Sequence, residues 1–153
     1  MAKEMQFDPE KMEIKEFKLL KGQVDAPEDF NSSVIKGHQS TTTLELSFNI
    51  EEGLVRAIIC TDIKTESNGA NIQEASGSFH LAYIYRVENI EDWASVNKDG
   101  YIICNPLLAN ALSTSSYSTS RGILLTRLQG TALSEFILPI INPQRLFQGV
   151  KKQ

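Results

Sequence analysis

The residues able to supply nucleophilic or metal chemistry are few in this chain, and they are widely spaced. It has two cysteines, Cys60 and Cys104, and two histidines, His38 and His80. A reactive thiol needs a nearby cation or a helix N-terminus to lower its pKa, and Cys60 lies among aliphatic residues instead. Cys104 directly precedes an expected helix start, but no histidine or acid is spaced to assist it. Phosphate-binding glycine loops, the GxSxG motif and metal-ligand spacings are also absent from the sequence. We therefore predict a protein that is not an enzyme and that uses neither a metal nor a cofactor.

Composition indicates one ordinary folded domain. The chain has 153 residues, of which 41% are hydrophobic and 22% are charged, and such values are typical of a globular protein rather than a disordered one. The length suits a single domain over residues 1–153, in which residues 1–10 are expected to form a loose polar arm. The sequence starts without a secretory-signal pattern, and no stretch is apolar enough to span a membrane. These features favour a cytoplasmic protein.

The charges are unevenly distributed along the chain. The net charge is −4, which argues against a general binder of nucleic acids or anionic membranes. Residues 41–92 carry nine acids and three bases, whereas residues 98–153 carry six bases and two acids. This asymmetry has two interpretations, an ordinary solvated surface or an acidic face that attracts a basic partner.

Alternating apolar and polar residues predict four antiparallel strands. The expected strands span residues 12–24, 43–50, 54–63 and 78–88. In the first strand the apolar parity shifts by one residue after Ile14, which is what a β-bulge produces. Residues 28–40 have no clear period and are expected to form a long connection between the first two strands.

The C-terminal third predicts helices. Asn105-Pro106 is a typical helix start, and a leucine stripe follows it. Ser113–Ser120 is rich in Ser and Thr, which compete for backbone hydrogen bonds, so we expect a break or kink there. A second helix is expected over Arg121–Leu128, ending near Gly130. The predicted fold class is α+β: a four-stranded antiparallel sheet with a long crossover after strand 1 and two C-terminal helices on one face.

Both faces of this sheet are expected to carry apolar residues. Phe79, Tyr83 and Tyr85 form an aromatic stripe that suits either a core face or a binding site, and the first role is the commoner one. The opposite face carries Ile58 and Ile84. Because two short helices can cover only one face, the other is a candidate for subunit packing or for a peptide groove.

Several segments, taken in order, resemble the SecB protein-export chaperones and their SecB-like relatives over about residues 12–147. The segments that carry the resemblance are Met12, Ile14 and Phe17 followed by Asp25-Ala26-Pro27, then Ala57-Ile58-Ile59-Cys60, then Tyr117–Leu128, and finally Gly130-Thr131, Pro139 and Leu146-Phe147. The resemblance implies a dimer of dimers that holds unfolded or export-competent polypeptides without ATP, in apolar grooves walled by the crossover, the sheet and the last helix.

The resemblance also suggests where clients and partners bind. The candidate peptide-binding residues are Phe30, Val34, Ile35, Leu146 and Phe147 from the resemblance, together with Leu44, Leu46, Phe48, Tyr83 and Tyr85 on the apolar sheet face. Asp25, Ile59 and Asp62 are the candidates for contact with a translocase ATPase, although Lys21 and Thr61 stand where the family has acids. The alternative is a non-chaperone module on the same fold that serves one dedicated partner, such as an antitoxin-type protein, or a small apolar ligand.

Overall fold

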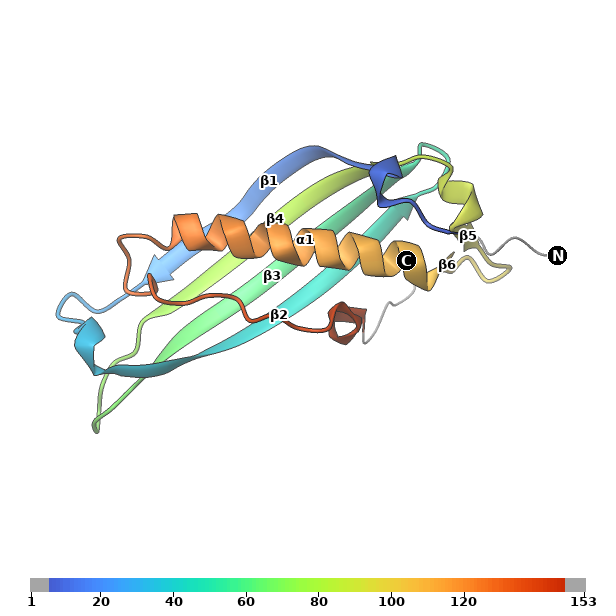
Figure 1. The fold of residues 1–153 in the computed structure, drawn as a ribbon. Helices are drawn as coiled ribbons and strands as arrows, with labels where there is room; N and C mark the ends of the chain where they lie inside the picture. The colour runs from blue at the N-terminus through green and yellow to red at the C-terminus, as the bar shows by residue number, and fades with distance from the viewer. Residues whose placement is uncertain (1–5, 148–153) are drawn as a thin grey trace.

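The structure is a computed structural model that describes residues 6–147, except for the side chain of Phe147. The fold is a four-stranded sheet with one long helix across it (Figure 1). The main strands are β1 (Met12–Asp25), β2 (Ile35–Asn49), β3 (Leu54–Ser67) and β4 (Ser76–Val87). A small hairpin of β5 (Ala94–Val96) and β6 (Ile102–Cys104) leads into α1 (Pro106–Arg127). Short 3₁₀ turns span Pro9–Lys11, Ser32–Val34, Ile90–Asp92 and Pro143–Phe147.

The sheet has the antiparallel order β1-β4-β3-β2. β1 and β2 therefore lie at opposite edges, and residues 26–34 carry the chain across between them. This arrangement confirms the predicted four strands and the crossover after the first. The predicted boundary of β2 was wrong, because the strand begins at Ile35 rather than at residue 43. Its first half is rich in Ser and Thr, and β-branched threonines such as Thr42 suit a strand even where the pattern is polar.

β1 contains two irregularities in its pairing with β4. The register shifts between Ile14 and Glu16 and again between Leu19 and Lys21. The first shift is the bulge that the change of apolar parity predicted. This first shift keeps Met12, Ile14, Phe17 and Leu19 opposite β4 residues that α1 covers.

One continuous helix replaces the two helices that were predicted. Ser116 and Ser120 are buried and face the sheet. The hydroxyl oxygen of Ser120 lies 2.7 Å from that of Tyr83, and the hydroxyl oxygen of Ser116 lies 2.8 Å from that of Tyr85. The serines therefore do not break the helix: their small side chains let α1 lie close to the sheet, and their hydroxyls satisfy buried tyrosines.

The pKa of Tyr83 follows from this packing and predicts an alkaline limit to stability. Burial raises the pKa of Tyr83 to about 12, whereas an unfolded tyrosine ionises near pH 10. The neutral form of Tyr83 is favoured in the fold. Its contribution to the free energy of unfolding is therefore complete below about pH 10 and is lost between about pH 10 and 12.

The urea concentration at the unfolding midpoint should therefore fall between about pH 10 and 12 in the parent, and we expect Tyr83→Phe to make this fall smaller. The half-buried Tyr101, changed to Phe, is the control that should keep the fall; equal slopes in both variants would contradict the assignment.

Residues 131–141 form a strap beside α1, with a bend and turns over 131–135 followed by a stretch without regular secondary structure (Figure 1). Arg121 Nε donates to the carbonyl of Leu138 over 3.0 Å, and the Tyr117 hydroxyl donates to that of Pro139 over 2.6 Å. The buried strap residues Leu133, Phe136 and Leu138 complete a second core cluster at this end of the sheet.

The opposite end of the molecule holds the first part of the described chain. The ring of Phe7 packs edge-to-face on Trp93 with centroids 5.0 Å apart, so this part of the predicted arm is docked on the domain. Residues 1–5 lie outside the described range. None of the helices within residues 6–147 has the length and apolarity that a membrane crossing requires.

Candidate peptide-binding surface

A groove lies between the crossover and the β3–β4 loop, and we name it the crossover groove. Its volume is about 470 Å³, which is in the range of ligand pockets. The apolar lining residues are Pro27, Phe30, Val34 and Ile72, and the polar ones are Asp29, Asn31, Asn71 and Gln73. The groove therefore has a mixed lining, in which the apolar side chains are half-buried and the polar ones are exposed.

The crossover wall is fixed by short-range hydrogen bonds. The Phe30 amide donates to the Pro27 carbonyl over 3.0 Å, and Asn31 caps the Ser32–Val34 turn by accepting from the Ser33 amide at 3.0 Å. One long-range bond then ties this wall to the other, because the Asn68 amide donates to the Val34 carbonyl over 2.8 Å. The two walls thus hold a fixed separation.

The loop wall depends on Glu74 and Gly69. The Glu74 carboxylate accepts hydrogen bonds from the Thr65 hydroxyl at 2.6 Å and from the Ser67 amide at 3.0 Å. These bonds, that of Thr65 foremost, lower the pKa of Glu74 and keep it ionised. Gly69 has φ +121°, and a Cβ on it would lie 2.8 Å from Ile72 Cδ1. Only glycine both adopts this φ and lets Ile72 fold back over it into the groove lining.

The candidate peptide-binding residues separate into a half-buried group and a buried group. Phe30 and Val34 line the crossover groove, and Ile35, the first residue of β2, follows directly. Tyr83 and Tyr85 are each only 1% exposed beneath α1, and Leu46 is 7% exposed. A client cannot touch these three side chains while the helix is in place, which corrects their assignment to the site.

The remaining candidates lie along β2 and after the strap. Leu44 and Phe48 are half-buried and pack against the core cluster that lies under the first half of α1. Leu146 is half-buried in the Pro143–Phe147 turn, which contacts α1 and β2. The side chain of Phe147 lies outside the described part of the chain. These positions are separate from the crossover groove lining.

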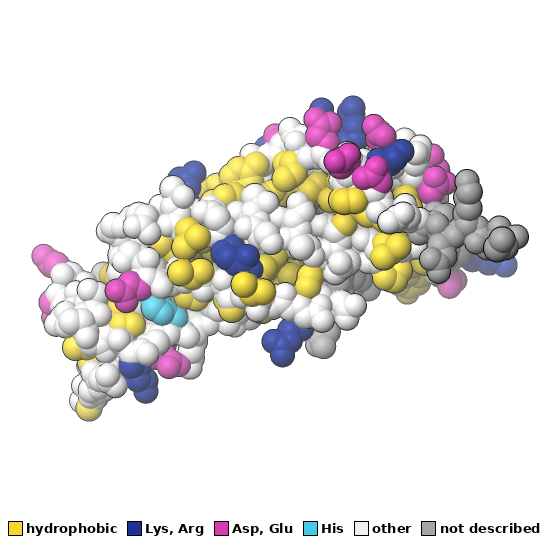
Figure 2. Space-filling view, in the orientation of Figure 1, with side chains coloured by type: hydrophobic (Ala, Val, Ile, Leu, Met, Phe, Trp, Pro, Cys, Tyr) yellow, Lys and Arg dark blue, Asp and Glu magenta, His cyan; other side chains and the backbone are white. Residues whose placement is uncertain are grey.

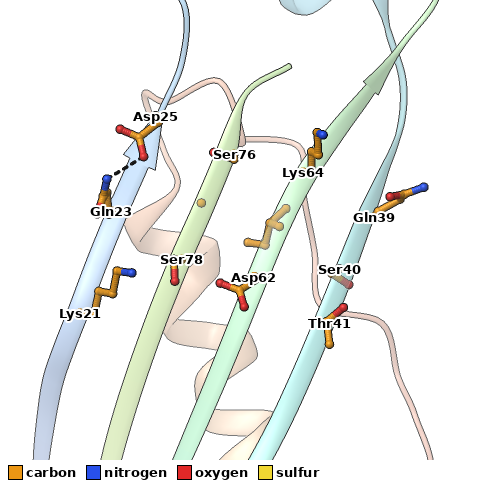
Figure 3. Close-up of a pocket in the computed structure, with 12 residues that line it drawn as sticks. Lys21, Gln23, Asp25, Gln39, Ser40, Thr41, Asp62, Lys64, Ser76 and Ser78 are labelled. Carbon is orange, nitrogen blue, oxygen red and sulfur yellow. Dashed lines mark hydrogen bonds between the residues drawn. The ribbon is translucent and has the colours of Figure 1, made fainter. Parts of the chain in front are cut away.

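The three candidates for translocase contact do not share a surface. Asp25 and Asp62 lie in a shallow polar hollow on the sheet face that α1 leaves open (Figure 3). Ile59 is 0% exposed on the covered face, so its assignment as a contact residue is corrected. Lys21 and Lys64 line the same hollow, which therefore carries both signs of charge. Figure 3 also shows the side chain of Gln23 donating to Asp25, over 2.7 Å.

The cysteines have the properties of structural residues. Burial raises the pKa of the Cys104 thiol to about 11, and burial also raises that of Cys60. Thiols of this kind are poor nucleophiles at neutral pH. Within residues 6–147 there is no group of three His, Cys, Asp or Glu side chains that could hold a metal ion.

Large apolar side chains are exposed on the helix side of the molecule. Figure 2 shows hydrophobic patches along β1 and beside α1. The exposed large hydrophobic residues are Ile14, Phe17, Leu20, Val96, Ile103, Leu107, Leu125, Ile137 and Ile140. None of them belongs to β2, β3 or β4, so the open sheet face, which the sequence proposed for packing or peptide binding, is not the main apolar surface.

The groove residues that the sequence analysis missed are Pro27, Asp29, Asn31, Asn71, Ile72 and Gln73. The Asn68-Gly69 pair marks the β3–β4 loop as a turn in the sequence. However, the loop becomes a wall only through its contact with the crossover, more than thirty residues away along the chain. No local pattern carries that information.

Comparison with known proteins identifies the fold. No protein-family model matches the chain, and no curated protein matches its sequence. The solved structure of the SecB-like chaperone Rv1957 of Mycobacterium tuberculosis, in complex with a ChAD peptide from the antitoxin Rv1956 HigA1, is similar at a TM-score of 0.60. The match covers 86% of this chain and 91% of that one, at 14% sequence identity. The resemblance seen in the sequence thus extends to three dimensions, and the chain has the SecB-like fold.

Proposed function

We propose that this protein is a SecB-like chaperone that holds unfolded or export-competent segments of other proteins, without ATP, in the crossover groove. The observation that carries the proposal is this groove itself, an open groove with four apolar lining residues between two hydrogen-bonded walls. It lies on a fold that is shared with a chaperone described in complex with a peptide. A cytoplasmic location is part of the same proposal.

The chemistry of the groove suits sequence-tolerant binding. Phe30, Val34 and Ile72 offer apolar contact that does not depend on the identity of a client side chain. The amide side chain of Asn71 carries donors and an acceptor that can bond the backbone of an extended peptide, and Asn31, whose oxygen already accepts from Ser33, can offer its amide donors. Backbone bonds and apolar contact are common to all unfolded chains, so one groove can accept unrelated clients.

A dedicated partner is the second candidate function. It is favoured by one observation, that the peptide held by the similar mycobacterial chaperone comes from an antitoxin. A protein of this kind would accept one sequence and refuse others. Service to a translocase ATPase has less support, because Lys21 and Lys64 interrupt the acidic positions around Asp25 and Asp62.

Self-association into a dimer of dimers belongs to the same proposal. Between Pro106 and Ser120 α1 carries no charged residue, and its exposed side includes Leu107 and Thr114. An uncharged helix surface on the outside of a single chain is typical of a face that packs against another subunit. Further along, Gly122 and Leu125 continue the same exposed side.

A double substitution in the groove tests the chaperone proposal. Val34→Gln with Ile72→Gln removes two apolar lining residues, and we expect the affinity for a permanently unfolded polypeptide to fall about tenfold or more. The matched control is Val96→Gln with Ile103→Gln on the β5–β6 hairpin, which should change affinity less than about twofold. Circular dichroism confirms folding in each case. A folded groove variant that captures the polypeptide as well as the parent would contradict the assignment.

A further inference from the structure

Asn68 and Gly69 are neighbours in the exposed part of the β3–β4 loop. The chain has nine asparagines, and the other eight precede Ser, Ile, Lys, Ala or Pro rather than Gly. A side chain on the residue that follows an asparagine shields the backbone nitrogen between them, whereas glycine leaves that nitrogen open to close approach. The side-chain carbonyl carbon of Asn68 and the backbone nitrogen of Gly69 are therefore an unshielded pair.

This pair also lacks the hydrogen bonds that hold several other asparagines in place. The side-chain oxygens of Asn31, Asn97 and Asn105 each accept a bond from the backbone amide two residues further on. Within residues 6–147, neither the Asn68 side chain nor the Gly69 amide makes a hydrogen bond, and the loop around them has no regular secondary structure. The Asn68 side chain is therefore able to turn toward the Gly69 nitrogen.

Two groups placed in this way react with water as the only co-reactant, which is one reason why asparagine is thermolabile. The Gly69 nitrogen gives its proton to solvent and attacks Cγ of Asn68. A bond forms between that nitrogen and Cγ, and the bond from Cγ to Nδ2 breaks as the amide group leaves as ammonia. Water then opens the resulting succinimide ring at either carbonyl. Opening at Cγ leaves aspartate, and opening at the main-chain carbonyl leaves isoaspartate.

Isoaspartate lengthens the loop at the point that fixes the second wall of the crossover groove. In this product the main chain runs through Cβ and Cγ of residue 68, which inserts an extra carbon atom before Gly69. The Asn68 amide, which donates to the Val34 carbonyl over 2.8 Å, lies before the insertion. Ile72, which folds back over Gly69, lies after it. The insertion therefore shifts Ile72 relative to the crossover wall.

The carboxylate that the reaction creates acts in the same direction. The Ser67 amide donates to the ionised Glu74 carboxylate over 3.0 Å, so the new negative charge arises one residue away from that contact and is repelled by it. We propose that Asn68 is a site of spontaneous deamidation and that its isoaspartate form loosens the loop wall of the crossover groove. The effect on clients rests on the proposed function, whereas the modification and the loosened wall do not.

Incubation of the folded protein in warm, mildly alkaline buffer tests the proposal. Peptide mapping by mass spectrometry follows each asparagine, and an isoaspartate methyltransferase assay reports the isomer. We expect Asn68 to convert while Asn71 stays intact, because Asn71 is exposed in the same loop but precedes Ile72. As isoaspartate accumulates, hydrogen exchange of the residue-68 amide should become about tenfold faster or more. An unfolded polypeptide should bind about fivefold more weakly, since Ile72 leaves the groove lining.

The control variant is Asn68→Ser, which keeps the backbone amide and lacks the reacting group, so its hydrogen exchange and affinity should survive the same treatment. The conditions are set with a synthetic peptide of residues 66–73 that does convert. An intact Asn68 in the folded protein, or isoaspartate that leaves exchange at residue 68 unchanged, would overturn the proposal. Failure of the fresh protein to capture any unfolded polypeptide would instead contradict the proposed function and leave the modification and the loosened wall intact.

Discussion

Replacing Ser116 by leucine is expected to lower the free energy of unfolding by about 3 kcal/mol. Ser116 is 0% exposed, and its hydroxyl oxygen lies 2.8 Å from that of Tyr85 between α1 and the sheet. A leucine there forces extra carbon atoms into a filled interface and replaces a hydrogen-bonding group beside the buried Tyr85 hydroxyl. The same substitution would strengthen an ordinary amphipathic helix, so the sign of the effect is diagnostic.

Ser118→Leu is the matched control. It makes the same chemical change two residues further along α1, where Ser118 is exposed. Leucine has the higher helix propensity, so stability should stay within about 0.5 kcal/mol of the parent or rise slightly. Urea unfolding followed by circular dichroism measures both variants. Equal effects at the two positions would contradict the packing of α1 on the tyrosines.

Replacing Gly77 by valine is expected to cost about 2–3 kcal/mol. A Cβ on Gly77 would lie 2.6 Å from Leu133 Cδ1 and 3.3 Å from Phe79 Cε2. Leu133 is itself 0% exposed, because the strap packs it into the second core cluster. It can yield to the valine only if the strap moves away from β4. Gly77 is therefore required by close packing, since its φ is not in the left-handed region.

Gly37→Val provides the comparison within the same sheet. A Cβ on Gly37 meets only the end of the Glu66 side chain, at 3.8 Å. Because β-branched residues favour strands, this variant should be neutral or slightly more stable. Thermal unfolding of the two variants gives the difference. Equal destabilisation would mean that glycine serves both positions for a reason other than the contact with Leu133.

The sheet could be predicted from the sequence because alternation is a local property of a strand. Its four strands, their antiparallel order along the chain and the bulge near Ile14 all follow from apolar parity. The start of β2 could not be predicted in this way, since its first residues are polar and pair at an edge. The single helix was missed for a different reason. The serines of α1 are opposite Tyr83 and Tyr85, and this pairing exists only after the helix docks.

Only part of the candidate site could be predicted from the sequence, because the patterns that were used are local. Period-two patterns identify an apolar face, but they do not say whether another element covers it. Tyr83, Tyr85 and Leu46 were assigned to a site and instead form the core beneath α1. Phe30 and Val34 do line a groove, and Ile72 completes it from a loop that no sequence pattern links to the crossover.

The central claim is that this SecB-like fold holds unfolded chains in a sequence-tolerant manner. The most direct test is to titrate the protein with two unrelated, permanently unfolded polypeptides while light scattering reports the mass of each complex. The account predicts that both are captured at about micromolar affinity or better by a particle of several copies. Refusal of both polypeptides by the folded protein would contradict the chaperone function, and capture of only one would favour a dedicated partner instead.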